Sequence, residues 1–361
     1  MEERREVAGA VKKVRDGRTE VYRCLLMLMV IVHHICCHGP YATSRTAWGI
    51  YWLTLPAVDG FVALSGWYGM RFSWQKVVRL WGMFAFYSAV VWGAREVAFA
   101  LGLSSARPAF QVAGGWFGGT YLGLLFCMPL VNAALEALAK EPRKLFGAWG
   151  LYALAILLGL RPLVWTSGMA VSGWGSHTFN TLLFVYVTAW VVRRFVADRV
   201  KSVAVAGVWV LAMGSVGAMV LLQALYKLWH GGALPRCLVN IHVAGYHFPG
   251  VWVAAIAALV LFARCPMPQW FQRLARFLGP SMLGIYLFHE TSLRKVLFCL
   301  PMEHLHARFP EVPLVFIFAA GVLLCFTLSL AVDLARRAGL ALLRRYATPL
   351  LAWGKRHLQR G

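Results

Sequence analysis

Ten long apolar stretches divide this chain of 361 residues and decide its fold class. Each has about the twenty residues that a helix needs to cross the hydrocarbon core of a bilayer. We therefore expect an all-α, polytopic membrane protein with about ten transmembrane helices. The expected spans are residues 22–38, 50–70, 77–101, 118–138, 146–165, 178–197, 203–229, 243–263, 277–298 and 313–335.

Positive charge gathers on alternate connections between these spans. Of the 36 lysines and arginines, 27 lie near the N-terminus, near the C-terminus or in every second loop. Cytoplasmic loops carry such an excess, so we expect both termini in the cytoplasm. The net charge of +22 then reflects topology and attraction to anionic membrane lipids, and a nucleic-acid partner is not expected.

The polar ends of the chain are short. Residues 1–20 are expected to form a basic cytoplasmic arm, residues 21–338 the membrane domain, and residues 339–361 a basic amphipathic tail on the inner surface. The eight cysteines lack metal-ligand spacing, so no metal is expected; Cys37, Cys237 and Cys299 fall near the outer face, where a disulfide is compatible with the sequence. The longer outer connections are expected to be surface loops, at about 102–117, 166–177, 230–242 and 299–312.

An arginine and a histidine interrupt the first apolar stretch. Arg23 and His34 are eleven positions apart, which places them on one helix face and about 16 Å apart along the axis. Ionisable groups are costly in hydrocarbon, so they usually face a protein interior or a cavity and often mark function. The alternative is structural: a histidine bonded to a neighbouring helix, and an arginine that reaches lipid phosphates.

Three ionisable residues from three spans reach a similar expected depth. His34 and His289 lie roughly 20 Å from the inner surface, and Asp59 enters from outside to nearly the same level. A neutral imidazole suits a general base, and a carboxylate from Asp59 or Glu290 would fix its tautomer. His34 is the expected base, whereas His33 points about 100° away and is expected to pack or to form a hydrogen bond. The tandem pair leaves both assignments open.

Span two ends in a glycine-rich segment that is followed by basic residues. The segment contains Ser65 and three glycines, which allow close approach either of a partner helix or of a ligand. Arg71, Lys76 and Arg79 follow at the expected inner face, on the side of Arg23, where they would bind the phosphates of a cytosolic cofactor. Lipid headgroups and the charge bias of inner loops explain the same residues.

Three acidic residues sit one helical turn from a basic residue and are expected to form ion pairs. The pairs are Glu290 with Arg294, Glu136 with Lys140, and Asp333 with Arg336 and Arg337. For Glu290 this pairing competes with a role in a site. His289 is equally compatible with a site role and with a structural hydrogen bond.

These residues together resemble the acyltransferase 3 family of multispan membrane acyltransferases. An arginine, ten residues and a histidine in the first span are the family's marker, and Arg23 to His34 fits it. Val58–Trp67, Trp116–Phe117 with Tyr121, and Ser281–His289 are similar to further family segments in the same order. The similarity runs from about residue 20 to residue 335.

The resemblance implies a ten-span enzyme of the bacterial inner membrane. Such an enzyme transfers an acyl group, usually acetyl, from cytosolic acyl-CoA to a hydroxyl of a cell-surface or lipid-linked carbohydrate. It implies His34 as base and Arg23 as a CoA-side partner; His289 carries over less directly, because the family has a proline shortly after this histidine. The expected catalytic residues are His34, Asp59, His289 and Glu290, and the expected cofactor-binding residues are Arg23, Ser65, Arg71, Lys76 and Arg79.

Two other classes of protein remain compatible with the sequence. Ten spans with buried charge and basic inner loops also suit a transporter or flippase of a glycan or lipid-linked substrate, although no inverted repeat is evident. A polymer-ligating protein with its chemistry in the outer loops is the other, but those loops carry few charges.

Overall fold

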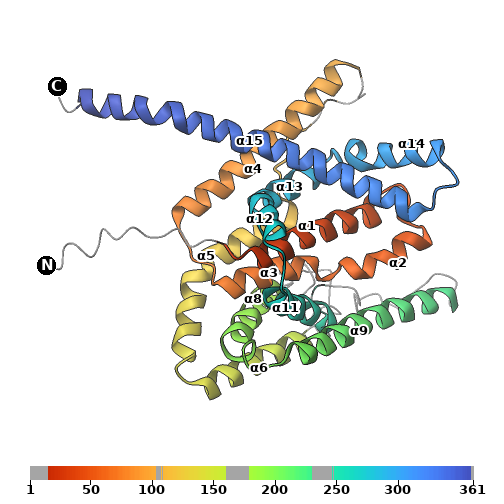
Figure 1. Ribbon diagram of the computed structural model, residues 1–361, viewed down its shortest axis with the longest axis vertical. Coiled ribbons are helices and arrows are strands. Elements are labelled where there is room, and N and C mark those ends of the chain that lie inside the picture. Colours follow the sequence, from red (N-terminus) through yellow and green to blue (C-terminus); the bar gives the residue numbers. More distant parts are fainter. Residues whose placement is uncertain are drawn as a thin grey trace.

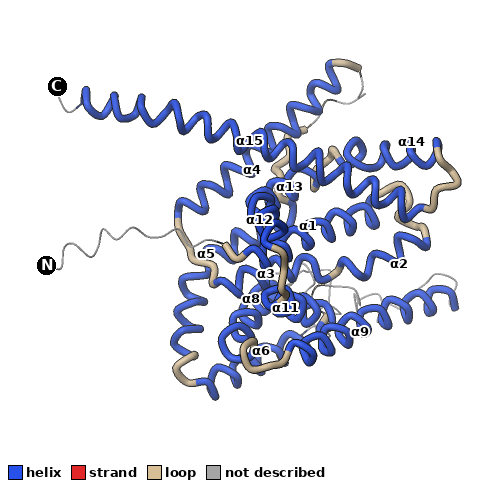
Figure 2. The backbone as a smooth tube through the Cα atoms, in the orientation of Figure 1, coloured by secondary structure: helices blue, strands red, loops and turns tan. Residues whose placement is uncertain are grey.

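The computed structural model describes residues 15–102, 107, 109–159, 179–229, 246 and 248–358. Across these residues the chain is helical and has no strand, as the sequence predicted (Figure 2). The helices are α1 Gly17–His38, α2 Arg45–Thr54, α3 Pro56–Tyr68, α4 Trp74–Ala100, α5 Gly115–Leu138, α6 Pro142–Gly159, α8 Phe179–Val191, α9 Ser202–Trp229, α11 Pro249–Arg264, α12 Gln269–Leu278, α13 Met282–His289, α14 Leu300–Arg308 and α15 Leu314–Leu358.

Seven helical segments in the described ranges are long and apolar enough to cross a membrane, so this is a multi-pass membrane protein. A helix stands at the position of each expected span. However, α11 has 16 residues and α13 has 8, which is shorter than an ordinary crossing. The number of ten crossings therefore stays a prediction.

Span two is divided by a proline. Helix α2 ends at Thr54, and Pro56 opens α3 at its first position. Proline has no backbone N–H and cannot continue the hydrogen bonds of a preceding helix, but its fixed φ suits a helix start. Leu55 between them keeps a helical conformation, and Arg45–Tyr68 together form one candidate span at the place of the expected span 50–70.

Span nine is also broken, and the break falls at a predicted site residue. Residues Gly279–Ser281 form a 3₁₀ turn, α13 ends at His289, and a π-helical turn covers Lys295–Cys299. Thr291 stands in the interruption: its hydroxyl donates to the Phe288 carbonyl, and the Leu293 N–H donates back to that hydroxyl. A side chain thus takes over hydrogen bonds that the helix backbone would otherwise make.

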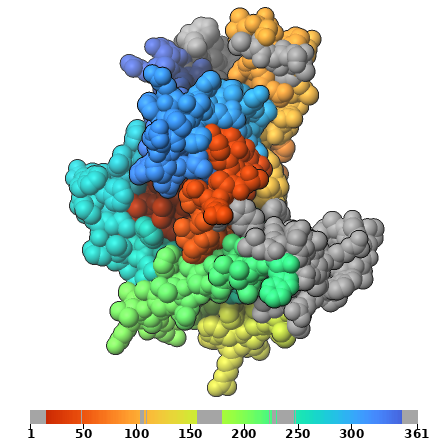
Figure 3. All heavy atoms as spheres, turned by 90° about the vertical axis from the view of Figure 1, so that its right-hand side faces the viewer, coloured from red at the N-terminus to blue at the C-terminus, as the bar shows by residue number. Residues whose placement is uncertain are grey.

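Helix α1 lies at the centre of the molecule (Figure 1). Asp16 caps it by accepting the Arg18 N–H at 3.0 Å, and its inward side chains, such as Leu26 and Ile31, are fully buried. It packs against α2, α3, α11, α12, α13 and α15. Figure 3 shows α1 and α2, in red and orange-red, between the blue C-terminal helices and the green α9. Most of the surroundings of α1 are therefore protein.

Helix α3 packs closely on two neighbours through glycines. A Cβ atom on Gly66 would lie 2.2 Å from the Tyr186 carbonyl oxygen of α8, and one on Gly60 would lie 2.5 Å from a methyl carbon of Leu26 on α1. Only a residue as small as glycine allows the helix backbones to approach each other this closely. The sequence allowed these glycines to admit either a partner helix or a ligand. At both positions the structure shows a partner helix.

Helix α15 continues to Leu358, well beyond the expected end of span ten, so the expected tail begins inside an unbroken helix (Figure 1). At its middle, the buried Asp333 pairs with Arg336 as expected, whereas Arg337 donates to the Ser281 hydroxyl. Helix α1 begins and α15 ends toward the same side of the molecule (Figure 1). That this side is cytoplasmic stays a prediction.

Several expectations concern the connections between helices. The stretch 299–312 contains α14 and is therefore not the expected loop. Cys37 and Cys299 form no disulfide within the described residues. Residues 1–14 of the basic arm, the loops at 166–177 and 230–242, and Cys237 lie outside the described ranges.

Candidate active site

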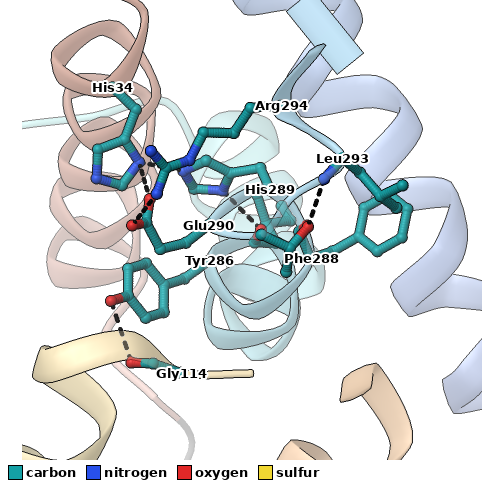
Figure 4. Close-up of polar contacts among 10 residues, drawn as sticks. His34, Gly114, Tyr286, Phe288, His289, Glu290, Leu293 and Arg294 are labelled. Atoms are coloured by element: carbon teal, nitrogen blue, oxygen red, sulfur yellow. Dashed lines mark hydrogen bonds and ion pairs between the residues drawn. The ribbon is translucent and has the colours of Figure 1, made fainter. Parts of the chain in front are cut away.

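A cluster of polar side chains joins α1 to the broken end of α13 (Figure 4). His34 lies one turn before the end of α1, His289 is the last residue of α13, and Glu290 follows it. The Nδ1 atom of His34 is 2.9 Å from Nε2 of His289 and 2.8 Å from Oε2 of Glu290. His289 is fully buried, and the side chains of His34 and Glu290 are 14% and 15% exposed. The structure thus brings three of the four expected catalytic residues together.

The early end of α13 produces this arrangement. Consecutive residues on a continuous helix point about 100° apart. Glu290 leaves the helix with φ −81° and ψ 54°, so its side chain and that of His289 both reach His34. The site therefore depends on the interruption of span nine.

The hydrogen bonds of the two histidines fix where their protons lie. Nδ1 of His289 is 2.7 Å from the Ile285 carbonyl oxygen, which can only accept, so Nδ1 carries the proton. A neutral His289 then accepts through Nε2, and His34 donates to it from Nδ1. The lone pair of a neutral His34 is consequently on Nε2, the ring nitrogen that points away from His289 and Glu290 in Figure 4.

Glu290 supplies the negative charge of the cluster. Arg294 donates to Oε1 of Glu290 at 2.5 Å, as the helix spacing predicted. Oε2 remains beside His34 but is not aligned to accept a hydrogen bond from it. The ion pair with Arg294 and the contact with His34 therefore coexist.

The same three residues could also be read as metal ligands. One ligand atom from each of His34, His289 and Glu290 lies within 4.8 Å of the others. To hold a cation, however, the two imidazoles would have to give up the hydrogen bond between them, and Arg294 would stand next to the metal. This donor set suits a proton relay better than a metal cage.

Asp59 and His33 lie outside this cluster. Asp59 is fully buried, and neither of its carboxylate oxygens has a hydrogen-bond partner within the described ranges. Its neighbour Gly60 faces Leu26, which is about 12 Å along α1 from His34. The structure therefore does not bring Asp59 to His34. His33 instead places Nδ1 2.9 Å from the Thr54 hydroxyl, in agreement with the hydrogen-bonding role expected for it.

A cavity of about 520 Å³ opens at the end of α3, near the start of α1. The two helix ends meet where the Thr19 hydroxyl contacts the Tyr68 hydroxyl. The guanidinium of Arg193 lies 4.9 Å from the centre of the Trp67 ring, a cation–π arrangement. The lining residues are Trp67, Tyr68, Gly69, Arg71, Asn132, Glu136, Trp190, Arg193, Arg194 and Asp198.

One of the five expected cofactor residues, Arg71, lines this cavity. Lys76 and Arg79 are exposed on the first two turns of α4, where the Lys76 ammonium donates to the Arg71 carbonyl. Ser65 is turned inward, with its hydroxyl donating to the Phe61 carbonyl.

The other arginines of the cavity were not among the expected site residues. Arg193 and Arg194 lie at the end of span six, so the charge pattern already placed them on the same side as Arg71. What the sequence could not reveal is that α8 packs beside α3. Arg194 also pairs with Glu136, which was expected to pair with Lys140.

A buried carboxylate holds Arg23. Glu20 is 2% exposed, and its Oε2 lies 3.3 Å from Nε of Arg23. A Cβ atom on Gly279 would fall 1.7 Å from the same oxygen, so a glycine is needed there to leave room for the carboxylate. The spacing of three residues between Glu20 and Arg23 is the sequence signal for this pair.

Comparison with known proteins gives one match. A family model described as an acyltransferase domain matches residues 19–333. No curated protein matches the chain, and no solved structure does. The matched region begins just before Glu20 and ends at Asp333, so it contains both the histidine cluster and the cavity.

Proposed function

The chain belongs to the acyltransferase 3 family, and on that premise we propose that it moves an acyl group, acetyl in the simplest case, from cytosolic acyl-CoA to a carbohydrate hydroxyl. The acceptor would be a cell-surface or lipid-linked glycan, and the enzyme would lie in a bacterial inner membrane. The observation that carries this proposal is the contact of Nδ1 of His34 with both His289 and Glu290, which leaves the lone pair of a neutral His34 on Nε2, the ring nitrogen turned away from Glu290.

The cavity at the end of α3 is our candidate for the nucleotide end of the donor. Its arginines, Arg71, Arg193 and Arg194, are suited to phosphates, and its aromatic side chains to a purine ring. Its volume of about 520 Å³ is that of a small-molecule site. Arg23 belongs to the same end of α1, and the thioester arm would span the roughly 16 Å from there to His34.

Within the histidine cluster, His34 would act as general base through Nε2. The proton of the acceptor hydroxyl passes to Nε2 as the hydroxyl oxygen bonds to the thioester carbonyl carbon. The carbon–sulfur bond breaks, and the same proton passes from Nε2 to the departing sulfur. Glu290 would stabilise the imidazolium that exists between these two transfers, and His289 would keep the ring in its orientation.

The test uses the purified full chain in proteoliposomes with radiolabelled acetyl-CoA and candidate glycans. Release of CoA thiol and transfer of label are measured for the wild type, His34→Ala and His33→Ala. We expect His34→Ala to lose about 10²–10⁴-fold in turnover, the usual contribution of a general base. His33→Ala is the comparison variant, because Nδ1 of His33 lies beside the Thr54 hydroxyl and a role as the base is not expected for it.

Normal turnover in folded His34→Ala would remove the proposed base. Substrate movement without any acyl-CoA dependence would instead point to the transporter alternative, to which the family match gives no support.

A further inference from the structure

Helix α12 is a surface helix next to the start of α1. It has 10 residues and connects α11 to the turn that precedes α13. Four large apolar side chains on it are exposed: Phe271 by 38%, and the three most exposed ones, Trp270 by 65%, Leu274 by 45% and Phe277 by 53%. At 100° per residue these three positions fall within about 60° of the helix circumference. They form a narrow apolar face, which we call the α12 apolar face.

The rest of α12 divides between protein contact and positive charge. Gln272 packs on Gly17, where an added Cβ would lie 2.4 Å from the Gln272 Cβ, and Ala275 is buried. Arg273 and Arg276 occupy the remaining sector, between the α1 contact and the α12 apolar face. One face of the helix is therefore anchored to α1, one is apolar and exposed, and one is basic.

We propose that α12 lies in the membrane interface and binds anionic phospholipid. The α12 apolar face would sit among the first carbons of the acyl chains, and Arg273 and Arg276 would lie at the phosphates. An amphipathic helix with basic and aromatic residues is suited to this position, and tryptophan is enriched at membrane interfaces. Figure 3 shows the cyan segment that contains α12 at the edge of the molecule.

A third basic residue belongs to the same surface. The guanidinium of Arg337 lies 5.6 Å from the centre of the Phe277 ring and donates to the Phe277 carbonyl. Positive charge thus borders the α12 apolar face from two helices. This charge is complementary to an anionic headgroup and would repel a second copy of the same basic surface, so lipid is the occupant that the charges favour.

Lipid binding to α12 would hold in place α1 and α13, the two helices that carry the histidine cluster. The start of α1 rests on α12 through Gly17 and Gln272. At its other end α12 continues into the Gly279–Ser281 turn and α13, which ends at His289. A lipid that holds α12 at the interface would hold both helices at a set depth. The inference concerns lipid contact alone and does not depend on the proposed reaction.

The experiment places a photoreactive side chain on the α12 apolar face of the full-length protein. Trp270→p-benzoylphenylalanine is reconstituted in nanodiscs of phosphatidylcholine mixed with phosphatidylglycerol, irradiated, and analysed by intact mass. Gln269→p-benzoylphenylalanine, one position away on the polar side, is the matched control. We expect phospholipid adducts at position 270, with phosphatidylglycerol enriched above its share of the membrane, and few adducts at position 269.

The charges are tested in the Trp270→p-benzoylphenylalanine background. Arg273→Gln with Arg276→Gln should reduce the phosphatidylglycerol enrichment about fivefold per arginine, which corresponds to about 1 kcal/mol for each basic residue near an anionic surface. Arg308→Gln, an exposed arginine at the end of α14, should leave the enrichment unchanged. Cross-linking to a second copy of the chain, equal lipid labelling at both positions, or adducts in bulk proportion would overturn the proposal.

Discussion

Replacing Glu290 by glutamine tests the electrostatic part of the proposed mechanism. The change keeps the size of the side chain and its capacity to accept a hydrogen bond from Arg294, but removes the negative charge beside His34. In the wild type Oε2 is 2.8 Å from Nδ1 of His34, and both side chains are about one-seventh exposed, at 14% and 15%. In the variant, the imidazolium formed during the reaction would face the guanidinium of Arg294 with no carboxylate between them.

The size of the effect follows from this distance. Two unit charges at about 3 Å attract by about 6 kcal/mol at the effective dielectric constant of roughly 20 that describes protein sites. Partial exposure and the charge of Arg294 screen the interaction, and we take about half of that value for the transition state. A loss of about 3 kcal/mol lowers the rate by about 10²-fold, because each 1.4 kcal/mol is a factor of ten.

The assay is steady-state release of CoA thiol in proteoliposomes, with kcat and KM determined separately. We expect kcat of Glu290→Gln to fall about 10²-fold with KM for acyl-CoA nearly unchanged, because the charge acts on a species present only during reaction. Glu303→Gln on the exposed surface of α14 is the control for charge removal on this side. If Glu290→Gln kept the wild-type kcat, or changed KM alone, the role given to this carboxylate would be wrong.

Two further predictions concern the ends of the helices that carry the sites. Glu20→Gln should raise KM for acyl-CoA up to about tenfold at constant kcat, a loss of about 1.4 kcal/mol, because Arg23 would lose the charge of the ion-pair partner that orients it. An equal loss in kcat would contradict a role in donor binding. Gly66→Ala should destabilise the protein by about 1–3 kcal/mol, because its Cβ would meet the Tyr186 carbonyl at 2.2 Å. Thermal denaturation in detergent checks this, with Gly82→Ala in the interior of α4, which has open space around it, as the control that should not be destabilised.

The sequence was a good guide to which residues are chemically unusual. The eleven-residue spacing placed Arg23 and His34 on one helix, and α1 does carry both. Depth arguments brought His289 to the level of His34, where the hydrogen bond between them is found. These predictions succeed because they depend on the rise and period of a single helix, and both are fixed by backbone geometry.

The same reasoning failed where the exact start of a span or the neighbours of a helix must be known. The depth of Asp59 is counted from residue 50, but the span already begins at Arg45, and the neighbouring Gly60 packs on Leu26 in the earlier turns of α1. Arg193 lines the cavity because α8 packs on α3. The charge pattern of the sequence does not predict this contact. Lateral order among helices is decided by side-chain packing between them, which a single sequence does not reveal.

Helix α1 has a second role beyond supplying residues, because it sets the distance between the two ends of the proposed reaction. Arg23 with Glu20 stands at one end and His34 at the other, on one unbroken helix that packs against six others. The separation of about 16 Å is therefore rigid. Inserting one alanine between the two residues would turn His34 by about 100° relative to Arg23, away from His289 or away from the donor end. The arginine and the histidine can work together only if their spacing keeps them on one face, which is a physical reason for a fixed number of residues between them.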